Sequence, residues 1–118
     1  METAAAPARL KLKAQIFVGD EIAFGPGKAD LLAAIDAQGS ISGAARAMGL
    51  SYRRAWLMVD AMNRLFAQPL VLTSRGGPGG ATLTAQGHAK LAAYRALQAE
   101  LARAAAGPGA ALLADVKT

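Results

Sequence analysis

The stretch SYRRAWLMVDAMNRLF, residues 51–66, is predicted to form one helix. One narrow stripe of this helix is apolar and is expected to face a core; at about 100° per residue its members are Ala55, Val59, Met62 and Phe66. The first turn instead carries two arginines and two aromatic residues. A buried helix does not place arginine there, and a fully solvated helix has little use for Tyr52 and Trp56. The sequence therefore predicts a helix with one face in the core and another face that meets a second molecule.

The residues before this helix predict the elements that hold it. A helix is expected over Lys28–Ala37, and a second, short helix over Gly43–Met48 with a serine at position 40 or 42 as its N-cap. Gly49 begins a tight turn, at a position where a positive φ is expected. Ser51 then caps the helix quoted above.

Two strands and a long helix are predicted after the quoted stretch. Leu70–Ser74 and Ala81–Leu83 are expected to pair as strands around the glycine-rich loop RGGPGG, residues 75–80. Thr84 then caps a helix that reaches about Ala104. A helix, a turn, a helix and a hairpin with a glycine tip form the order of elements in a winged helix-turn-helix. The predicted fold class is therefore mainly α with small β-hairpins, a winged helix-turn-helix followed by a long C-terminal dimerisation helix.

The two ends of the chain lead to separate predictions. Alternating apolar and polar residues over Leu10–Val18 predict a half-buried strand, which Gly19-Asp20 would turn into a return strand at Glu21–Phe24. A Gly-Pro-Gly sequence interrupts the last segment. We expect a flexible N-terminus over residues 1–9, one folded domain over residues 10–105 and a flexible tail over residues 106–118.

Composition excludes several classes of function. The chain of 118 residues has no cysteine, which removes disulfides, thiol catalysis and cysteine metal sites. No apolar run is long enough for a membrane span and the N-terminus has no signal-peptide core, so we expect a cytoplasmic protein. His88 has no acidic or histidine neighbour at helical spacing, and no metal site is predicted. Because no nucleophile, base and acid cluster in the sequence, neither an enzyme nor a cofactor is expected.

Positive charge is concentrated in the middle of the chain. The net charge is +5, and residues 40–80 contain five arginines against one aspartate. Charge alone leaves two interpretations open, a solvated basic face and a nucleic-acid surface. Arg53 and Arg54 in the first turn of the quoted helix favour DNA, because a recognition helix presents its N-terminal residues to base edges and arginine is the usual reader of guanine.

The glycine-rich loop is interpreted as the tip of a DNA-binding wing. Its glycines let backbone amides approach phosphates, and Arg75 can bind phosphate or enter the minor groove. Trp56 lies one turn from Tyr52 and can stack on it, but we favour a structural role for Trp56, packing against the wing or the first helix. The residues predicted to bind DNA are Ser42, Ser51, Tyr52, Arg53, Arg54, Leu57, Arg64, Arg75, Gly76, Gly77, Gly79 and Gly80.

Three segments, GSISGAARAMGLSYRRAW, MNRLF and RGGPGGATLTAQG, carry a resemblance to a known family. They resemble the DNA-binding domain of the ModE family of molybdate-responsive transcription regulators, which is related to the winged helices of LysR-type regulators. The likeness covers about Leu10–Arg103. It implies a sequence-specific transcription regulator that binds a palindromic operator in double-stranded DNA as a homodimer, linked to molybdate or metal-related genes.

The resemblance also indicates a difference from the family. Its members carry C-terminal oxyanion-binding domains, whereas this chain ends at Thr118, so a single-domain form is expected. The basic residues outside the predicted DNA-facing region are scattered along the sequence. For both reasons no bound molybdate is expected.

A stripe on the long C-terminal helix has no evident use in so small a monomer and predicts dimerisation; it consists of Leu91, Tyr94, Leu97 and Leu101. The resemblance implies the same dimer, assisted by the N-terminal segment. One alternative stays open, a dimerisation or interaction module that modulates a full-length regulator without strong DNA binding of its own. Salt-dependent binding to DNA would separate the two functions.

Overall fold

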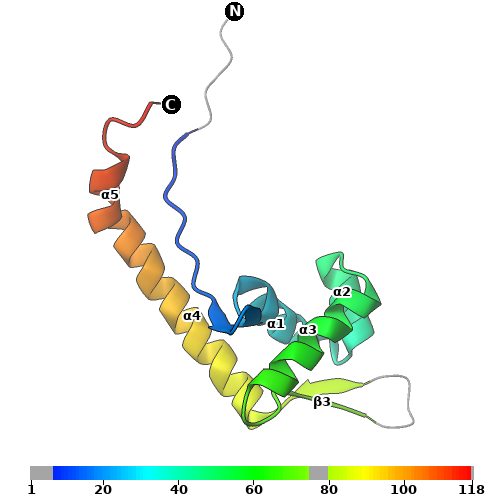
Figure 1. Cartoon of the computed structure of the whole chain (residues 1–118). Helices are drawn as coiled ribbons and strands as arrows, with labels where there is room; N and C mark the ends of the chain where they lie inside the picture. The colour runs from blue at the N-terminus through cyan, green and yellow to red at the C-terminus, as the bar shows by residue number, and fades with distance from the viewer. Residues whose placement is uncertain (1–6, 75–79, 118) are drawn as a thin grey trace, which may run out of the picture.

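A helix-turn-helix forms the centre of the fold, with one β-hairpin before it in the chain and one after it (Figure 1). The computed structural model describes residues 7–74 and 80–117. In chain order the elements are β1 (Ile16–Val18), β2 (Glu21–Phe24), α1 (Pro26–Gln38), α2 (Ile41–Met48), α3 (Tyr52–Leu65), β3 (Val71–Thr73), β4 (Ala81–Leu83), α4 (Ala85–Ala106) and α5 (Pro108–Leu113). β1 pairs with β2 and β3 with β4, both antiparallel. The predicted winged helix-turn-helix, mainly α with small hairpins and a long C-terminal helix, is confirmed.

The core lies where α1 meets α2 and α3. Leu31, Leu32 and Ile35 of α1 are fully buried. They belong to one apolar cluster with Val59 and Met62 from the predicted stripe of α3. Because burying each large aliphatic side chain contributes about 1.5–3 kcal/mol, this cluster fixes which face of α3 turns inward and which stays in solvent.

Capping residues fix the starts of α2 and α3, and a glycine forms the turn between the two helices. The Ser40 hydroxyl accepts a hydrogen bond from the Gly43 N–H at 2.9 Å, and the Ser51 hydroxyl accepts one from the Arg54 N–H at 3.0 Å. Each such cap contributes about 1 kcal/mol. Gly49, between the two helices, has φ of 69°, in the left-handed region that favours glycine. The predicted turn is confirmed, with Ser40 as the first cap.

The second hairpin is hydrogen-bonded to the helix-turn-helix at both ends. Asn63 of α3 accepts from the N–H groups of Leu70 and Val71 at 2.9 and 3.1 Å, and its side-chain amide donates to the Val71 carbonyl at 3.0 Å. At the other end the Ala81 N–H donates to the Gly39 carbonyl at 2.9 Å. The hairpin is therefore held in a set position beside α3.

The N-terminal segment differs from the predicted strand. Strand β1 contains only Ile16–Val18, all three of them exposed, and the residues before it run alongside α4 in Figure 1 without pairing. The reason is that β2 has four residues and its pairing ends with Phe24 opposite Ile16. No strand of the described chain remains to pair with the preceding residues. We call residues 9–15 the N-terminal arm.

The end of the chain also differs from the predicted loose tail, because Pro108–Leu113 form the short helix α5. Pro108 lies in the first turn of α5, where the N–H that proline lacks would have no intrahelical partner in any case. Gly109 is buried against the arm, since a Cβ atom there would lie 2.5 Å from Leu10 Cδ2. The Gly-Pro-Gly sequence therefore starts a helix that contacts the arm.

The first half of α4 packs on the core, which changes the interpretation of its apolar stripe. Tyr94 is buried, its ring lies edge-on to Phe24 with centroids 5.2 Å apart, and its hydroxyl donates to the Ala14 carbonyl at 2.8 Å. Leu91 is half-buried against the same cluster. The expectation that this stripe has no use within one chain is therefore wrong for Tyr94 and Leu91, whereas Leu97 is 43% exposed.

Candidate nucleic-acid interface

The N-terminal half of α3 presents a mixed basic and apolar surface to solvent. Tyr52 and Leu57 are 53% and 55% exposed, and Arg53 is exposed between them. These three residues, with Trp56 and Asp60, line one shallow hollow of about 400 Å³. Arginine donates to the edge of guanine and apolar side chains contact the thymine methyl group. The structure therefore brings together the chemistry of base reading at residues predicted from the sequence to bind DNA.

Trp56 lies on this surface and not beneath it. It is 40% exposed, and its indole Nε1–H donates to the Tyr52 hydroxyl oxygen at 2.8 Å. The structural role against the wing or the first helix, which the sequence favoured, stays a prediction, because residues 75–79 of the wing lie outside the described residues. Because the two residues are four apart on a helix, their side chains are neighbours, and the hydrogen bond holds the Tyr52 ring in place.

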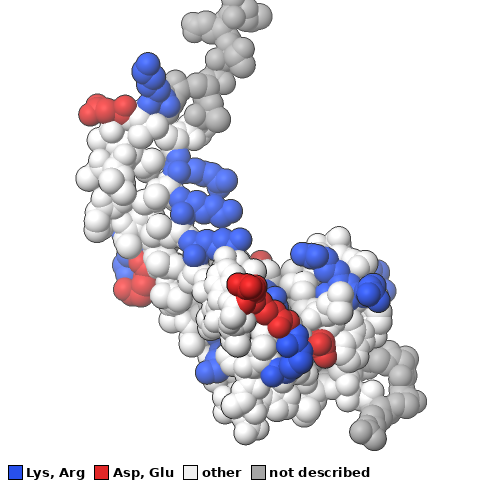
Figure 2. All heavy atoms as spheres, in the orientation of Figure 1, with Lys and Arg blue, Asp and Glu red and all other residues white. Residues whose placement is uncertain are grey.

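Salt bridges divide the positive side chains into two groups. Arg64, Arg95 and Arg103 each pair with a carboxylate. Within residues 7–74 and 80–117, the lysines and arginines without such a partner are Arg9, Lys11, Lys13, Lys28, Arg46, Arg53, Arg54, Lys90 and Lys117. Figure 2 shows basic side chains gathered along the N-terminal arm and over α2 and the start of α3. A group of cations without counter-charges is the electrostatic pattern of a polyanion-binding surface.

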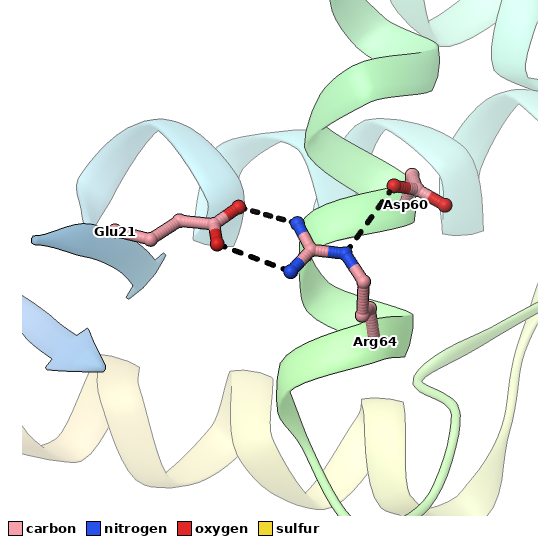
Figure 3. A network of polar contacts seen from close by, with 3 residues as sticks. All are labelled: Glu21, Asp60 and Arg64. Atoms are coloured by element: carbon pink, nitrogen blue, oxygen red, sulfur yellow. Dashed lines mark hydrogen bonds and ion pairs between the residues drawn. The ribbon is translucent and has the colours of Figure 1, made fainter. Parts of the chain in front are cut away.

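Arg64 belongs to the paired group (Figure 3). Its guanidinium makes two hydrogen bonds to the carboxylate of Glu21 on β2, one of them 3.1 Å long, and lies 3.7 Å from Asp60. The hydrogen bond with Arg64 lowers the pKa of Glu21, and the same bond raises the pKa of Arg64. Arg64 thus joins the first hairpin to α3. Its predicted DNA contact stays a prediction, which would require the guanidinium to leave Glu21.

Three cations meet at a place that sequence reasoning missed. Lys13 of the arm, Lys28 of α1 and Arg54 of α3 line a hollow of about 320 Å³, which we call the basic hollow. Burial lowers the pKa of Lys28, the charge of Arg54 lowers it further, and the charge of Glu21 opposes both. Lys13 and Lys28 look scattered in the sequence, and only the folded chain brings them beside the DNA-facing helix. The alternating lysines of the arm, Lys11 and Lys13, were the sequence feature that could have indicated this basic site.

The wing residues are described only in part. Four residues predicted to bind DNA, Arg75, Gly76, Gly77 and Gly79, lie outside the described residues. Gly80 forms a bridge with Ser40. The Ser42 hydroxyl, half-buried in the first turn of α2, lies 3.5 Å from the Ser40 hydroxyl. Gly80 and Ser42 therefore adjoin the same turn, at the N-terminus of α2.

The described ranges contain neither a cluster of metal ligands nor a helix suited to crossing a membrane. No three histidine, aspartate or glutamate side chains within them gather as metal ligands would. None of their helices combines the length and apolar character that a membrane crossing needs.

Residues 28–88 match the family model described as bacterial regulatory helix-turn-helix protein, lysR family. This range begins in α1 and ends in the first turn of α4, so it contains the helix-turn-helix and the second hairpin. The basic and apolar surface of α3 lies inside it.

Three curated relatives align with the same part of the chain. The molybdenum-pterin-binding protein MopB of Rhodobacter capsulatus is 53% identical over 62% of this chain. The molybdenum transport protein ModE of Azotobacter vinelandii is 47% identical over 59%, and the DNA-binding transcriptional dual regulator ModE of Escherichia coli (strain K12) is 37% identical over 72%. The chain spans only 28%, 27% and 31% of the length of these relatives.

Proposed function

Because the chain belongs to the bacterial regulatory helix-turn-helix proteins of the lysR family, we propose that it is a transcription regulator that binds a specific, palindromic operator in double-stranded DNA as a homodimer. The family is one of DNA-binding regulators and not a class of enzymes. The resemblance to the DNA-binding domain of the ModE regulators is confirmed. The link to molybdate or metal-related genes, suggested by the names of these relatives, and a cytoplasmic location are part of the proposal.

One observation carries the DNA-binding proposal. The first two turns of α3 expose Arg53, Arg54 and Leu57, while Ala55 and Val59 on the opposite face are buried. A recognition helix enters the major groove with this end first, where arginine and apolar side chains read base edges. In our proposal Arg53 and Leu57 read bases, and Arg54, on the flank toward the basic hollow, binds the phosphate backbone.

The dimer is supported by an apolar face that one chain leaves open. Ile16 of β1 and Leu97 of α4 are 49% and 43% exposed, and both line one hollow of about 240 Å³. Contiguous exposed apolar side chains of this kind mark an interaction surface. A second copy that packs α4 and β1 against this face would cover it symmetrically. To read successive major grooves, the two recognition helices of such a dimer must lie about 34 Å apart.

The proposal is tested by binding to operators selected from random DNA. We expect an Arg53→Ala, Arg54→Ala double variant to lose about 1–3 kcal/mol for each arginine that reads a guanine, with relaxed specificity at that base pair. An Arg95→Ala, Arg103→Ala double variant removes the same charge from α4, where both arginines pair with carboxylates, and serves as the control. A folded Arg53, Arg54 double variant with wild-type operator affinity would contradict the assignment.

The interaction-module alternative makes a different prediction. If the protein only modulates a full-length regulator, selection from random DNA enriches no site, and affinity for any duplex is weak at physiological salt. The expected absence of molybdate binding also stays a prediction. It was argued partly from basic residues that are scattered in the sequence, whereas in the structure Lys13 and Lys28 line one hollow with Arg54.

A further inference from the structure

The N-terminal arm holds its cations in set positions. Near its start, Leu10 packs against the buried Gly109 of α5. Near its end, the Ala14 carbonyl accepts the hydrogen bond from the buried Tyr94 of α4. A segment tied to the fold at both ends loses little further conformational entropy when its side chains bind a ligand.

Three cations occupy alternate positions of this extended arm. Arg9, Lys11 and Lys13 are exposed, and in Figure 2 the basic side chains of the arm stack on the side turned away from α4. Extended residues two apart are separated by about 6.6 Å. Because none of the three pairs with a carboxylate of the described residues, the arm presents a row of charges without counter-charges. A row of charges fits a polyanion better than a single ion.

The basic hollow joins this row to α3. Lys13 belongs both to the arm and to the hollow, where it lies with Lys28 and Arg54. Like charges that converge repel one another, and the lowered pKa of Lys28 reflects its burial together with this repulsion. The nearby carboxylate of Glu21 is already bound by Arg64. An anion in the hollow would relieve the repulsion, and a DNA phosphate is the anion adjacent to a recognition helix.

We propose that Arg9, Lys11 and Lys13 of the arm, with Lys28 in the basic hollow, form a second DNA-binding surface that contacts the phosphate backbone outside the groove entered by α3. This inference rests on the proposed function, because it takes operator DNA as the ligand of α3. The arm supplies affinity and register, while base recognition stays with α3.

The salt dependence of operator binding measures these phosphate contacts. An Arg9→Gln, Lys11→Gln, Lys13→Gln variant keeps the side-chain stems and removes three charges. We expect the slope of log K against log salt to become less steep by about 0.9 for each phosphate that the variant no longer neutralises, or about 2.7 for the three charges of each subunit. The control is Arg95→Gln, Arg103→Gln, Lys117→Gln, which removes the same charge from residues outside the arm, the basic hollow and α3 and should leave the slope nearly unchanged. Circular dichroism and thermal unfolding check that both variants are folded.

Neutral phosphates locate the contact made by the hollow. Single methylphosphonates are placed along the selected operator. At the phosphate that Lys28 contacts, the substitution should weaken the wild type and have no effect on a Lys28→Gln variant, whereas substitutions at other contacted phosphates should weaken both proteins. Equal salt slopes for the arm variant and the wild type, both binding operator, would overturn this inference and leave the proposed function intact. A wild-type protein that binds no DNA would overturn both.

The basic hollow could instead bind a small oxyanion from solution. Calorimetry of the protein without DNA, using inorganic phosphate and molybdate as probes, should show no saturable binding at micromolar concentration. Saturable binding that Lys28→Gln abolishes, with an unchanged salt slope in the arm variant, would assign the hollow to a free oxyanion and overturn the DNA contact.

Discussion

Leu57 is exposed in the middle of a helix whose other face is buried, and nothing else in the described chain covers it. Next to it, Trp56 donates its N–H to the Tyr52 hydroxyl, so the two rings and the leucine form an apolar surface between charged neighbours. In the major groove the matching apolar group is the thymine methyl. We therefore assign Leu57 and Tyr52 to thymine, and Arg53 to guanine.

Thymine replaced by deoxyuridine tests the role of Leu57, because only the methyl group is removed. At the positions that contact Leu57 we expect wild-type affinity to fall by about 0.8 kcal/mol, roughly fourfold, the value of one buried methyl or methylene group. A Leu57→Ala variant should bind the thymine and deoxyuridine operators equally. Fluorescence anisotropy at fixed salt measures both, with deoxyuridine in the flanking DNA as the control. Uniform wild-type binding to every substituted operator would remove the assignment.

A second single residue, Gly87, shows how closely α4 approaches the second hairpin. A Cβ atom at Gly87 would lie 2.2 Å from the Leu70 carbonyl oxygen, which is backbone and cannot turn away. We expect Gly87→Ala to destabilise the fold by about 1–3 kcal/mol or more, outweighing the gain of about 1 kcal/mol in helix propensity. Urea unfolding measures the change.

Gly27→Ala, in α1, is the matched control, because a Cβ atom there meets only Met58 Cε of α3 at 3.7 Å, an ordinary contact. This variant should be as stable as the wild type or slightly more stable. Equal unfolding free energies for the two alanine variants would contradict the close approach of α4 to the Leu70 carbonyl.

At the scale of elements, the Glu21–Arg64 pair connects the first hairpin to the C-terminal end of α3. The residues proposed to read bases lie at the other end of this helix. The hairpin also leads into the arm, so the pair helps to set the arm relative to α3. Both partners are exposed, which makes the pair dependent on salt and pH. An exposed ion pair adds little to the free energy of folding, so the main effect of this pair is to hold the hairpin in place.

The pair predicts a pH dependence of stability. Because the pKa of Glu21 is lowered from 4.5 in the folded chain, its contribution is fully present above the unfolded pKa and is lost as the pH falls through the folded pKa. We expect Glu21→Gln to be less stable than the wild type at neutral pH and to approach it in acid. Urea midpoints measured across this range test the prediction. Asp20→Asn, in the adjoining turn, is the control, and a difference that persists unchanged in acid would contradict the ion pair.

The whole molecule is too elongated to be explained as a single globule. Its extents are 59 × 36 × 27 Å, and its radius of gyration is 17.8 Å, against about 13 Å for a compact chain of this length. The second half of α4 projects from the helix-turn-helix in Figure 1, with the arm and α5 beside it. An elongated arm-and-helix unit with an exposed apolar face is consistent with the proposed dimer.

The dimer is tested by placing a charge on that face. We expect Leu97→Glu to convert a dimer into a monomer at micromolar concentration in light scattering, because the carboxylate would be buried without a partner. Leu72→Glu puts the same charge on an exposed leucine of β3 and should leave the mass unchanged. A wild-type protein that is already monomeric at this concentration would count against the dimer.

Local chemistry alone determined the main elements of this protein. The apolar stripes of α1 and α3, the caps at Ser40 and Ser51 and the positive φ of Gly49 depend on residues within a few positions of each other. Such interactions repeat with the period of the helix and can be identified without knowing the fold. The same holds for the exposed arginines at the start of α3, since their position follows from the buried stripe opposite.

Only the tertiary structure decided which similar residues have different roles. Arg53 and Arg64 lie on the same side of one helix, yet Arg64 is paired with Glu21, 43 residues away. Tyr94 was predicted for a dimer interface, but its hydroxyl bonds to Ala14, 80 residues away. The basic hollow likewise needs the arm, α1 and α3 together. Contacts of this range depend on how elements pack against one another, and no local periodicity encodes which side chain of a helix will meet a distant partner.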